Sequence, residues 1–215
     1  MLAIDLHTHS RFFHGFAGRP TPYDPIGAQL LAVSGRWQDL DAVALTNHDY
    51  YASFPTIGSR PSLIPGIEVT TSAGHVLVVG PDPPSRTAPG ELSPEEVVSV
   101  AHDRDCAAII AHPFRRSHVR ESGAEFDAVE INGKHTDEFH RVQTLSDTLG
   151  LPIVGGSDAH YPFETGRAFT RINAARPTAE AVVAAIRDGR VEPVFRGSHL
   201  DRAMQTVYRY VHEYL

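Results

Sequence analysis

Short apolar segments alternate along the chain with longer segments whose apolar residues recur at helical spacing. The short segments have the length of buried strands, and regular alternation with helices is typical of α/β proteins with parallel sheets. The pattern predicts strands at residues 2–6, 42–46, 63–70, 107–111, 127–131, 151–154, 168–172 and 191–195. Residues 75–79 are expected to turn back on residues 63–70 through Ala73-Gly74.

Helices are expected between these strands. The sequence Tyr23-Asp24-Pro25 begins one that reaches about Ser34 and stops at Gly35. The sequence Ser93-Pro94-Glu95-Glu96 is a capping box, and it predicts a helix to about Asp105. Three more helices are predicted from about Asp137 to Gly150, from Thr178 to Gly189, and from Ser198 to the C-terminus with Met204, Val207, Tyr208 and Val211 on a core-facing stripe. About seven β/α units result, which favours a barrel over an open sheet.

Length and composition exclude several classes of protein. A chain of 215 residues can bury one sizeable core, so a single domain, residues 1–215, is expected. The lone cysteine, Cys106, excludes an internal disulfide framework and a thiolate zinc finger. No apolar stretch is long enough to cross a membrane, and a secretory signal is lacking, so a cytoplasmic location is expected. The net charge of −7 argues against general binding of duplex nucleic acid. The oligomeric state stays open.

Histidine is the residue type that stands out, with 13 copies. His7 and His9 follow an apolar strand, and residues i and i+2 of a strand point to the same side, so both imidazoles can bind one ion. In parallel α/β folds the chemistry lies at the carboxyl ends of the strands. Seven histidines and two carboxylates are expected at such ends or in the adjoining turns: His7, His9, His14, His48, Glu68, His75, His112, Asp158 and His160.

In its order and spacing this set resembles the ligand pattern of the polymerase and histidinol phosphatase (PHP) family of metal-dependent phosphoesterases. The resemblance spans about residues 4–160, and all nine positions of the family pattern can be filled. It implies a distorted, seven-stranded, TIM-like β/α barrel. One loop departs from the commonest family form, since the residues after His9 read Ser10-Arg11-Phe12-Phe13-His14 instead of a Ser-Asp-Gly-like turn.

The resemblance also implies how the side chains divide among two or three divalent ions. His7, His9, Glu68 and Asp158 hold the first ion; Glu68 bridges to a second, completed by His75 and His112; and His14, His48 and His160 hold a third. Asp5, on the same strand, is a candidate for orienting an imidazole, and an ordinary hydrogen-bonding role at the strand end is the alternative.

The ligand types indicate both the metal and the reaction. Imidazole mixed with carboxylate favours zinc, manganese or iron over magnesium. Bound metal lowers the pKa of water toward about 7, so a metal-bound hydroxide is the expected nucleophile on phosphorus, with Glu68, Asp158 and His160 as the catalytic residues. Candidate phosphate contacts are Arg115, Arg116, Arg167 and Lys134. The expected substrate is a small phosphomonoester, a nucleotide or a nucleic-acid terminus.

Two other functions fit the same residues. Metal-dependent amidohydrolases also combine a barrel, an opening His-x-His and a late aspartate, and many of them bridge two ions with a carboxylated lysine. Lys134 is the only lysine and does not follow the fourth predicted strand, whereas Glu68 is placed to bridge, which favours phosphoester cleavage. The third interpretation is a metal-binding module without catalysis.

Overall fold

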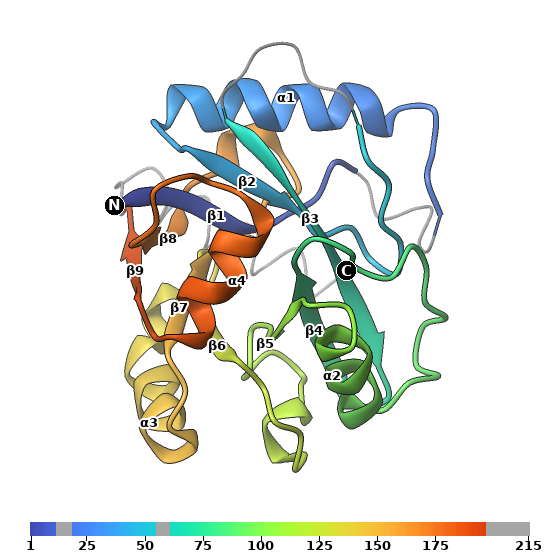
Figure 1. Cartoon of the computed structure of the whole chain (residues 1–215), viewed down its shortest axis with the longest axis vertical. Helices are drawn as coiled ribbons and strands as arrows, with labels where there is room; N and C mark the ends of the chain where they lie inside the picture. The colour runs from blue at the N-terminus through green and yellow to red at the C-terminus, as the bar shows by residue number, and fades with distance from the viewer. Residues whose placement is uncertain (12–18, 55–60, 197–215) are drawn as a thin grey trace.

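The apolar segments form the strands of one sheet in the computed structural model, which describes residues 1–11, 19–54 and 61–196. Within these residues the strands are β1 Leu2–Thr8, β2 Ala42–Leu45, β3 Ser62–Thr71, β4 Gly74–Val79, β5 Ala107–Ile110, β6 Ala128–Asn132, β7 Ile153–Gly156, β8 Ala168–Ile172 and β9 Val191–Phe195. Their order across the sheet is β7-β6-β5-β4-β3-β2-β1-β8-β9 (Figure 1). Each predicted strand is present, with bounds that differ from the prediction by at most two residues.

The prediction of seven strands is wrong, because the described residues form nine. β3 and β4 are separate strands of an antiparallel hairpin, joined at a tight turn where Gly74 has a φ of 134°. β4 also pairs antiparallel with β5, and β8 lies antiparallel between β1 and β9. A hairpin needs only a short turn, which accounts for the antiparallel pairing of β3 with β4. The sheet is therefore mixed, not parallel.

The sheet curls until β7 lies against β1 and β8, which makes a nearly closed barrel. The Gly155 amide donates to Oγ1 of Thr170, 2.9 Å away, and the His9 amide donates to the carbonyl of Ala159, also 2.9 Å away. Glycine at position 155 permits this approach, because an added Cβ would lie 2.5 Å from the carbonyl oxygen of Phe169. The expected barrel architecture holds in outline, without the regular repeat of a TIM barrel.

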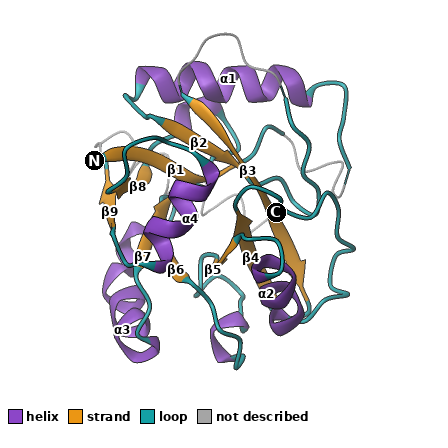
Figure 2. Cartoon of the chain, in the orientation of Figure 1, coloured by secondary structure: helices purple, strands orange, loops and turns teal. Residues whose placement is uncertain are grey.

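Three helices lie on the outside of the sheet (Figures 1 and 2): α1 Asp24–Trp37, α2 Pro94–His102 and α3 Phe139–Leu149. The capping box of α2 is confirmed, since the Ser93 side chain accepts from the Glu96 amide and the Glu96 carboxylate accepts from the Ser93 amide. The predicted stop at Gly35 is wrong. Gly35 lies inside α1, where the missing side chain lets the helix approach Val43 and Pro61 closely.

Short 3₁₀ turns cover Val119–Glu121, Thr136–Glu138 and Pro162–Glu164. The last described helix, α4 Ala179–Arg187, begins at Thr178, whose side chain accepts from the Ala181 amide as predicted. The helix expected from Ser198, with its stripe of Met204, Val207, Tyr208 and Val211, lies outside the described residues.

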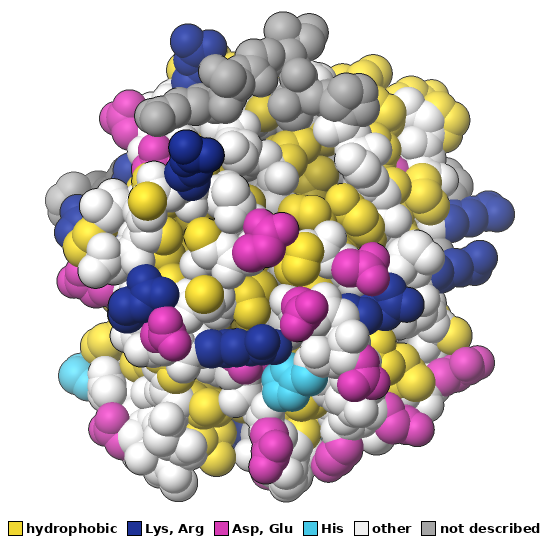
Figure 3. All heavy atoms as spheres, in the orientation of Figure 1, with side chains coloured by type: hydrophobic (Ala, Val, Ile, Leu, Met, Phe, Trp, Pro, Cys, Tyr) yellow, Lys and Arg dark blue, Asp and Glu magenta, His cyan; other side chains and the backbone are white. Residues whose placement is uncertain are grey.

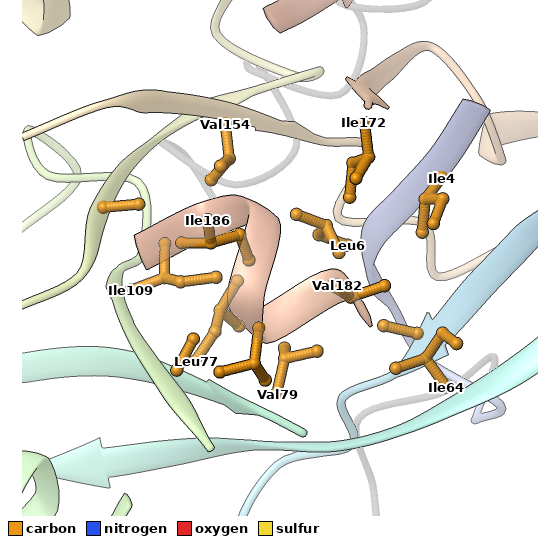
Figure 4. Close-up of a cluster of buried hydrophobic side chains, with 14 of the residues drawn as sticks. Ile4, Leu6, Ile64, Leu77, Val79, Ile109, Val154, Ile172, Val182 and Ile186 are labelled. Atoms are coloured by element: carbon orange, nitrogen blue, oxygen red, sulfur yellow. The ribbon is translucent and has the colours of Figure 1, made fainter. Parts of the chain in front are cut away.

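The main core fills one end of the barrel interior, and α4 packs into it (Figure 4). Figure 4 shows the apolar side chains of α4 surrounded by those of the strands. The labelled side chains are Ile4, Leu6, Ile64, Leu77, Val79, Ile109, Val154, Ile172, Val182 and Ile186. Nearly every strand contributes to this cluster, which leaves the opposite end of the interior for other side chains.

The face of the molecule at α4 carries acidic and basic side chains interspersed with one another (Figure 3). No extended basic area is visible on this face. Among the described helices, none combines the length and apolar character that crossing a membrane requires.

Candidate metal centre

A β-bulge in β1 aims His7 and His9 into the barrel. Asp5 pairs with Val43 and Thr8 pairs with Leu45, so three steps along β1 match two steps along β2. The extra residue breaks the alternation of the strand. Leu6 therefore packs with the interior core, while the next residue, His7, contacts interior carboxylates.

The interior of the barrel changes from apolar to polar along the strands. On β3 the inward residues run from Ile64 to Glu68, and at the end of β5 they run from Ile109 to His112. β4 runs in the opposite direction, so its inward histidine, His75, lies near its beginning and not its end. Polar side chains from separate segments thus meet at one end of the barrel.

Glu68 is the centre of this polar cluster and is 1 % exposed. Its Oε1 lies 2.7 Å from Nδ1 of His75 and 3.0 Å from Nε2 of His112. Its Oε2 lies within 3.3 Å of three further imidazoles, those of His7, His9 and His48. Five histidines that lie on, or just after, strands β1, β2, β4 and β5 therefore surround a single buried carboxylate.

Asp158 is the second buried carboxylate, and its backbone has a φ of 53° after β7. Its Oδ1 lies 3.3 Å from Nε2 of His9 and 3.3 Å from Nδ1 of His160. The ammonium group of Lys134 is 3.4 Å from the same oxygen, and Arg115 Nη1 is 3.3 Å from Oδ2. A left-handed backbone at a residue other than glycine stores strain of the kind often found at functional sites.

Burial and neighbouring charges both act on the pKa values of these groups, and for Glu68 they oppose each other. Burial alone would raise the pKa of the Glu68 carboxyl, but His48, His7 and His75 outweigh it and hold that pKa well below its usual range. The pKa of His9 is lowered by burial and by neighbouring His160. These shifts favour a charged Glu68 carboxylate and a neutral His9 imidazole, the forms in which each can bind a cation.

The pKa of His48 falls to about 4 because the side chain is desolvated. His48 and His75 are nevertheless the more exposed members of the cluster, with side chains 27 % and 29 % exposed. The cluster therefore opens to solvent on the side of these two histidines.

The structure brings together eight of the nine predicted ligand residues, and His14 lies outside the described residues. Three groups have ligand atoms within 4.8 Å of one another: His7, His9 and Asp158; His48, Glu68 and His75; and His9, His48 and His160. His112 adjoins the second group through Glu68. The proposed division of these residues among individual ions stays a prediction.

The residues fit a bound metal ion. Nε2 of His9 is buried and lies 3.3 Å from an oxygen of Glu68 and 3.3 Å from an oxygen of Asp158, without hydrogen-bond geometry to either. Nitrogen and oxygen atoms that converge in this way, without donating to one another, are arranged as ligands of a shared cation.

The four predicted phosphate contacts have different surroundings. Lys134 is buried, with Nζ 3.0 Å from Nδ1 of His160, and Arg115 reaches Asp158 from a partly exposed position. Arg116 is exposed. Arg167 is buried, and its Nη1 lies 3.3 Å from Oε1 of Glu164. Lys134 and Arg115 thus adjoin the candidate ligands directly.

The sequence interpretation missed two carboxylates that support the cluster. Glu130 on β6 contacts Nδ1 of His7, and Glu164 accepts a hydrogen bond from the amide of His160. The sequence did hold one signal for Glu130, since it is a charged residue inside the apolar segment 127–131. A buried charge usually has a partner, so its position indicated a contact with another polar group.

Asp5 does not orient an imidazole. Its side chain accepts hydrogen bonds from the backbone amides of His7, Ser157 and Gly166. Burial raises the pKa of this carboxyl to about 6. The ordinary hydrogen-bonding role, considered as the alternative, is the one present.

Comparison with known proteins gives one family match. The family model described as PHP-associated matches residues 138–191, a segment from the end of the turn before α3 to the start of β9 that includes Asp158 and His160. A search of the curated proteins finds no match to this sequence.

Several solved structures share the fold. PsfC from Pseudomonas syringae PB-5123 is 18% identical with a TM-score of 0.73, and the match covers 98% of each chain. A two-domain protein from Bacteroides vulgatus ATCC 8482, containing a predicted PHP-like metal-dependent phosphoesterase, is 18% identical with a TM-score of 0.61; the match covers 91% of this chain and 65% of that one. The lesion-specific endonuclease PfuEndoQ from Pyrococcus furiosus is 18% identical with a TM-score of 0.61, covering 87% of this chain and 56% of that one.

At 18% identity the structural likeness establishes the fold alone. The PHP-associated match is a match between sequences. Both findings agree with the resemblance to the PHP family that the ligand-type residues indicated, and the sequence match itself covers residues 138–191.

Proposed function

We propose that this protein is a metal-dependent phosphoesterase, a hydrolase of phosphate esters. The observation that carries the proposal is the group of five imidazoles around Glu68, all within 3.3 Å of a carboxylate that is 1 % exposed. Burial of so many polar groups at one place costs free energy unless a ligand satisfies them. Divalent cations are the ligands that this set of nitrogen and oxygen atoms suits, and zinc, manganese or iron fits it better than magnesium.

The residues of the chain have distinct roles in this proposal. Glu68 and Asp158 hold two or three ions together with the histidines, including His14, which completes the third set. When bound, the ions lower the pKa of water and neutralise phosphate charge, which is the chemistry they supply. His160 joins the two carboxylates as the third catalytic residue, since its imidazole contacts both Asp158 and Lys134.

Positive side chains beside Asp158 provide for the phosphate group. Lys134 Nζ and Arg115 Nη1 lie 3.4 Å and 3.3 Å from the Asp158 carboxylate, where they can reach an ester held at the same place. Arg116 and Arg167 complete the proposed set. A negatively charged chain that gathers positive charge locally suits a small anion, so the proposed substrate is a phosphomonoester, a nucleotide or the terminus of a nucleic acid.

The test combines elemental analysis with a hydrolysis screen. The purified protein is loaded with zinc, manganese or iron and assayed on phosphomonoesters, nucleotides and short oligonucleotides. We expect turnover of at least one class, and we expect His9→Ala and Asp158→Asn to remove activity and at least one equivalent of metal while the protein stays folded. Retention of activity in both variants would refute the assignment.

A carbonyl hydrolase of the amidohydrolase type is the second candidate, because a buried lysine, Lys134, adjoins the cluster. Its contacts are with His160 and Asp158, whereas the central, bridging place belongs to Glu68. A nitrophenyl phosphate and a nitrophenyl ester assayed side by side separate the two functions, and ester turnover without phosphatase activity reverses the ranking. Metal-loaded protein that is inert to both indicates a binding module without catalysis.

A further inference from the structure

Glu130 is a buried charge that the proposed ligand set does not use. It lies on β6, is 0 % exposed, and points into the polar end of the barrel interior. An ionised side chain in such a place is unfavourable unless each of its oxygens has a partner.

Each oxygen of Glu130 contacts a different candidate ligand. Oε1 lies 2.7 Å from Nδ1 of His7, which belongs to β1. Oε2 accepts a hydrogen bond of 2.8 Å from the backbone amide of His112, which follows β5. The Nδ2 atom of Asn132 lies 3.4 Å from the same Oε2. One carboxylate therefore connects two segments that the chain places more than 100 residues apart.

The neighbouring strand leaves room for this contact. Gly156 on β7 faces Glu130 and His7, and an added Cβ there would lie 2.5 Å from Cβ of His7 and still nearer to Oε1 of Glu130. A side chain at position 156 cannot be accommodated without moving one of the two. The glycine is thus an independent feature that fits the Glu130–His7 pair.

We propose that Glu130 is a positioning residue that fixes two metal ligands at once. By accepting from Nδ1 of His7 it selects the tautomer whose Nε2 lone pair faces Glu68, 3.2 Å away, and Asp158. By accepting from the amide of His112 it holds the backbone where φ is 27°, a left-handed conformation that is strained for histidine. The inference rests on the metal-binding part of the proposed function.

Glu130→Gln tests the inference sharply, because only a carboxylate can accept a hydrogen bond at both ends. The amide that replaces it has one acceptor and one donor end, so either His7 or the His112 amide faces a donor. The variant is nearly isosteric, which preserves the packing around β6.

Zinc binding measured by calorimetry is the first measurement, with zinc alone as the probe. We expect Glu130→Gln to weaken zinc affinity about 10-fold to 100-fold, the usual effect of losing a partner behind a histidine ligand. Gly156→Ala is also expected to weaken zinc affinity, because the added methyl group displaces Glu130 or His7. Affinity in Glu130→Gln within about twofold of the unsubstituted protein overturns the proposal.

Nitrogen NMR of the histidine side chains in the zinc-loaded protein is the second measurement. In the unsubstituted protein we expect a protected proton on Nδ1 of His7 and zinc bound through Nε2. In Glu130→Gln we expect that proton to exchange rapidly or the tautomer to change. An unchanged His7 spectrum in Glu130→Gln overturns the tautomer argument, whatever happens to stability.

Asp127→Asn is the matched control. Asp127 precedes β6 by one residue, and its carboxylate contacts the Ala108 amide, His102 and Arg187, away from the cluster. We expect this variant to lose stability and to keep zinc affinity. Equal losses of zinc affinity in Asp127→Asn and Glu130→Gln would mean that any loosening of β6 has the same effect, which overturns the proposal.

The outcomes separate this inference from the proposed function. If the unsubstituted protein binds zinc but hydrolyses no phosphate ester, the proposed function fails, and the ratio of zinc affinities still decides the role of Glu130. If it hydrolyses esters and Glu130→Gln binds zinc equally well, the proposed function stands and the inference fails. A protein that binds no zinc, manganese or iron overturns both.

Discussion

The two ends of the barrel interior are built by the same strands, but one end is apolar and the other holds the polar cluster. At one end Ile109, Leu77 and their neighbours pack around α4, and every side chain buries apolar surface. At the other end Glu68, Asp158 and most of the histidines are buried too, and their polar atoms need one another, nearby polar side chains or a bound ion as partners. The apolar end therefore supplies folding free energy, whereas the polar end consumes part of it to hold a site in place.

Glu68→Gln breaks the polar end and should have the largest effect. The amide keeps the shape but loses the charge at the centre of five imidazoles. We expect hydrolysis of a nitrophenyl phosphate to fall about 10³-fold or more, because metal ions supply several kcal/mol of transition-state stabilisation. Steady-state rates and elemental analysis of the folded variant are the measurements. Full metal content with more than about a tenth of the activity contradicts the central role of Glu68.

Ile109→Ala breaks the apolar end. Ile109 is fully buried, so we expect a loss of about 2–5 kcal/mol in the free energy of unfolding, from lost burial and the cavity left behind. Urea denaturation of the metal-free protein measures it. The folded variant should have the metal content and activity of the unsubstituted protein. If it loses metal without urea, at a temperature at which it is folded, the two ends of the barrel interior are not separable.

Metal removal sharpens the comparison. A metal at about 100 times its dissociation constant should stabilise the native protein by about 2.7 kcal/mol, and dialysis against a chelator should reverse this. Thermal unfolding with and without metal is the measurement. Ile109→Ala should show the same increment, since its site is intact, and Glu68→Gln should show little. An equal increment in both variants would place the bound metal elsewhere.

Ile186→Val should have the smallest effect, and it tests whether the apolar and polar ends of the barrel interior contribute independently to stability. The loss of one methylene where α4 meets the core should cost about 0.5–1.5 kcal/mol. Combined with Glu68→Gln in the metal-free protein, the two changes should add within about 0.5 kcal/mol, because the residues share no partner. A larger coupling energy, measured by a double-mutant cycle in urea, means that α4 and the polar cluster respond to each other.

Local features of the fold were predictable where local interactions decide them. The capping box at Ser93 and the strands from apolar segments hold because neighbouring residues specify them. Gly35 was predicted as a helix stop, but packing against Val43 and Pro61 keeps it inside α1. The separation of β3 from β4, and with it the count of nine strands, depends on which strands become neighbours in space.

The sequence allowed the ligand residues of the candidate site to be predicted, but not the residues that hold those ligands in position. His7, Glu68 and Asp158 could be chosen because of their residue types at strand ends. The bulge that turns His7 inward has no signature in the sequence, since it arises from the pairing of β1 with β2. For the same reason Asp5, on the expected face, pairs with backbone amides, while Glu130 from a distant strand takes the place behind His7.

By itself the sequence determined which residues can bind a cation and which must be buried, because ligand chemistry and hydrophobicity belong to individual side chains. It also determined the local turns and caps. Only the tertiary structure decided that the barrel closes with β7 against β1, and that six histidines and two carboxylates converge at one end of it. The reason is physical: convergence depends on contacts between segments far apart in the chain, and the register of one strand pair decides which way each side chain points.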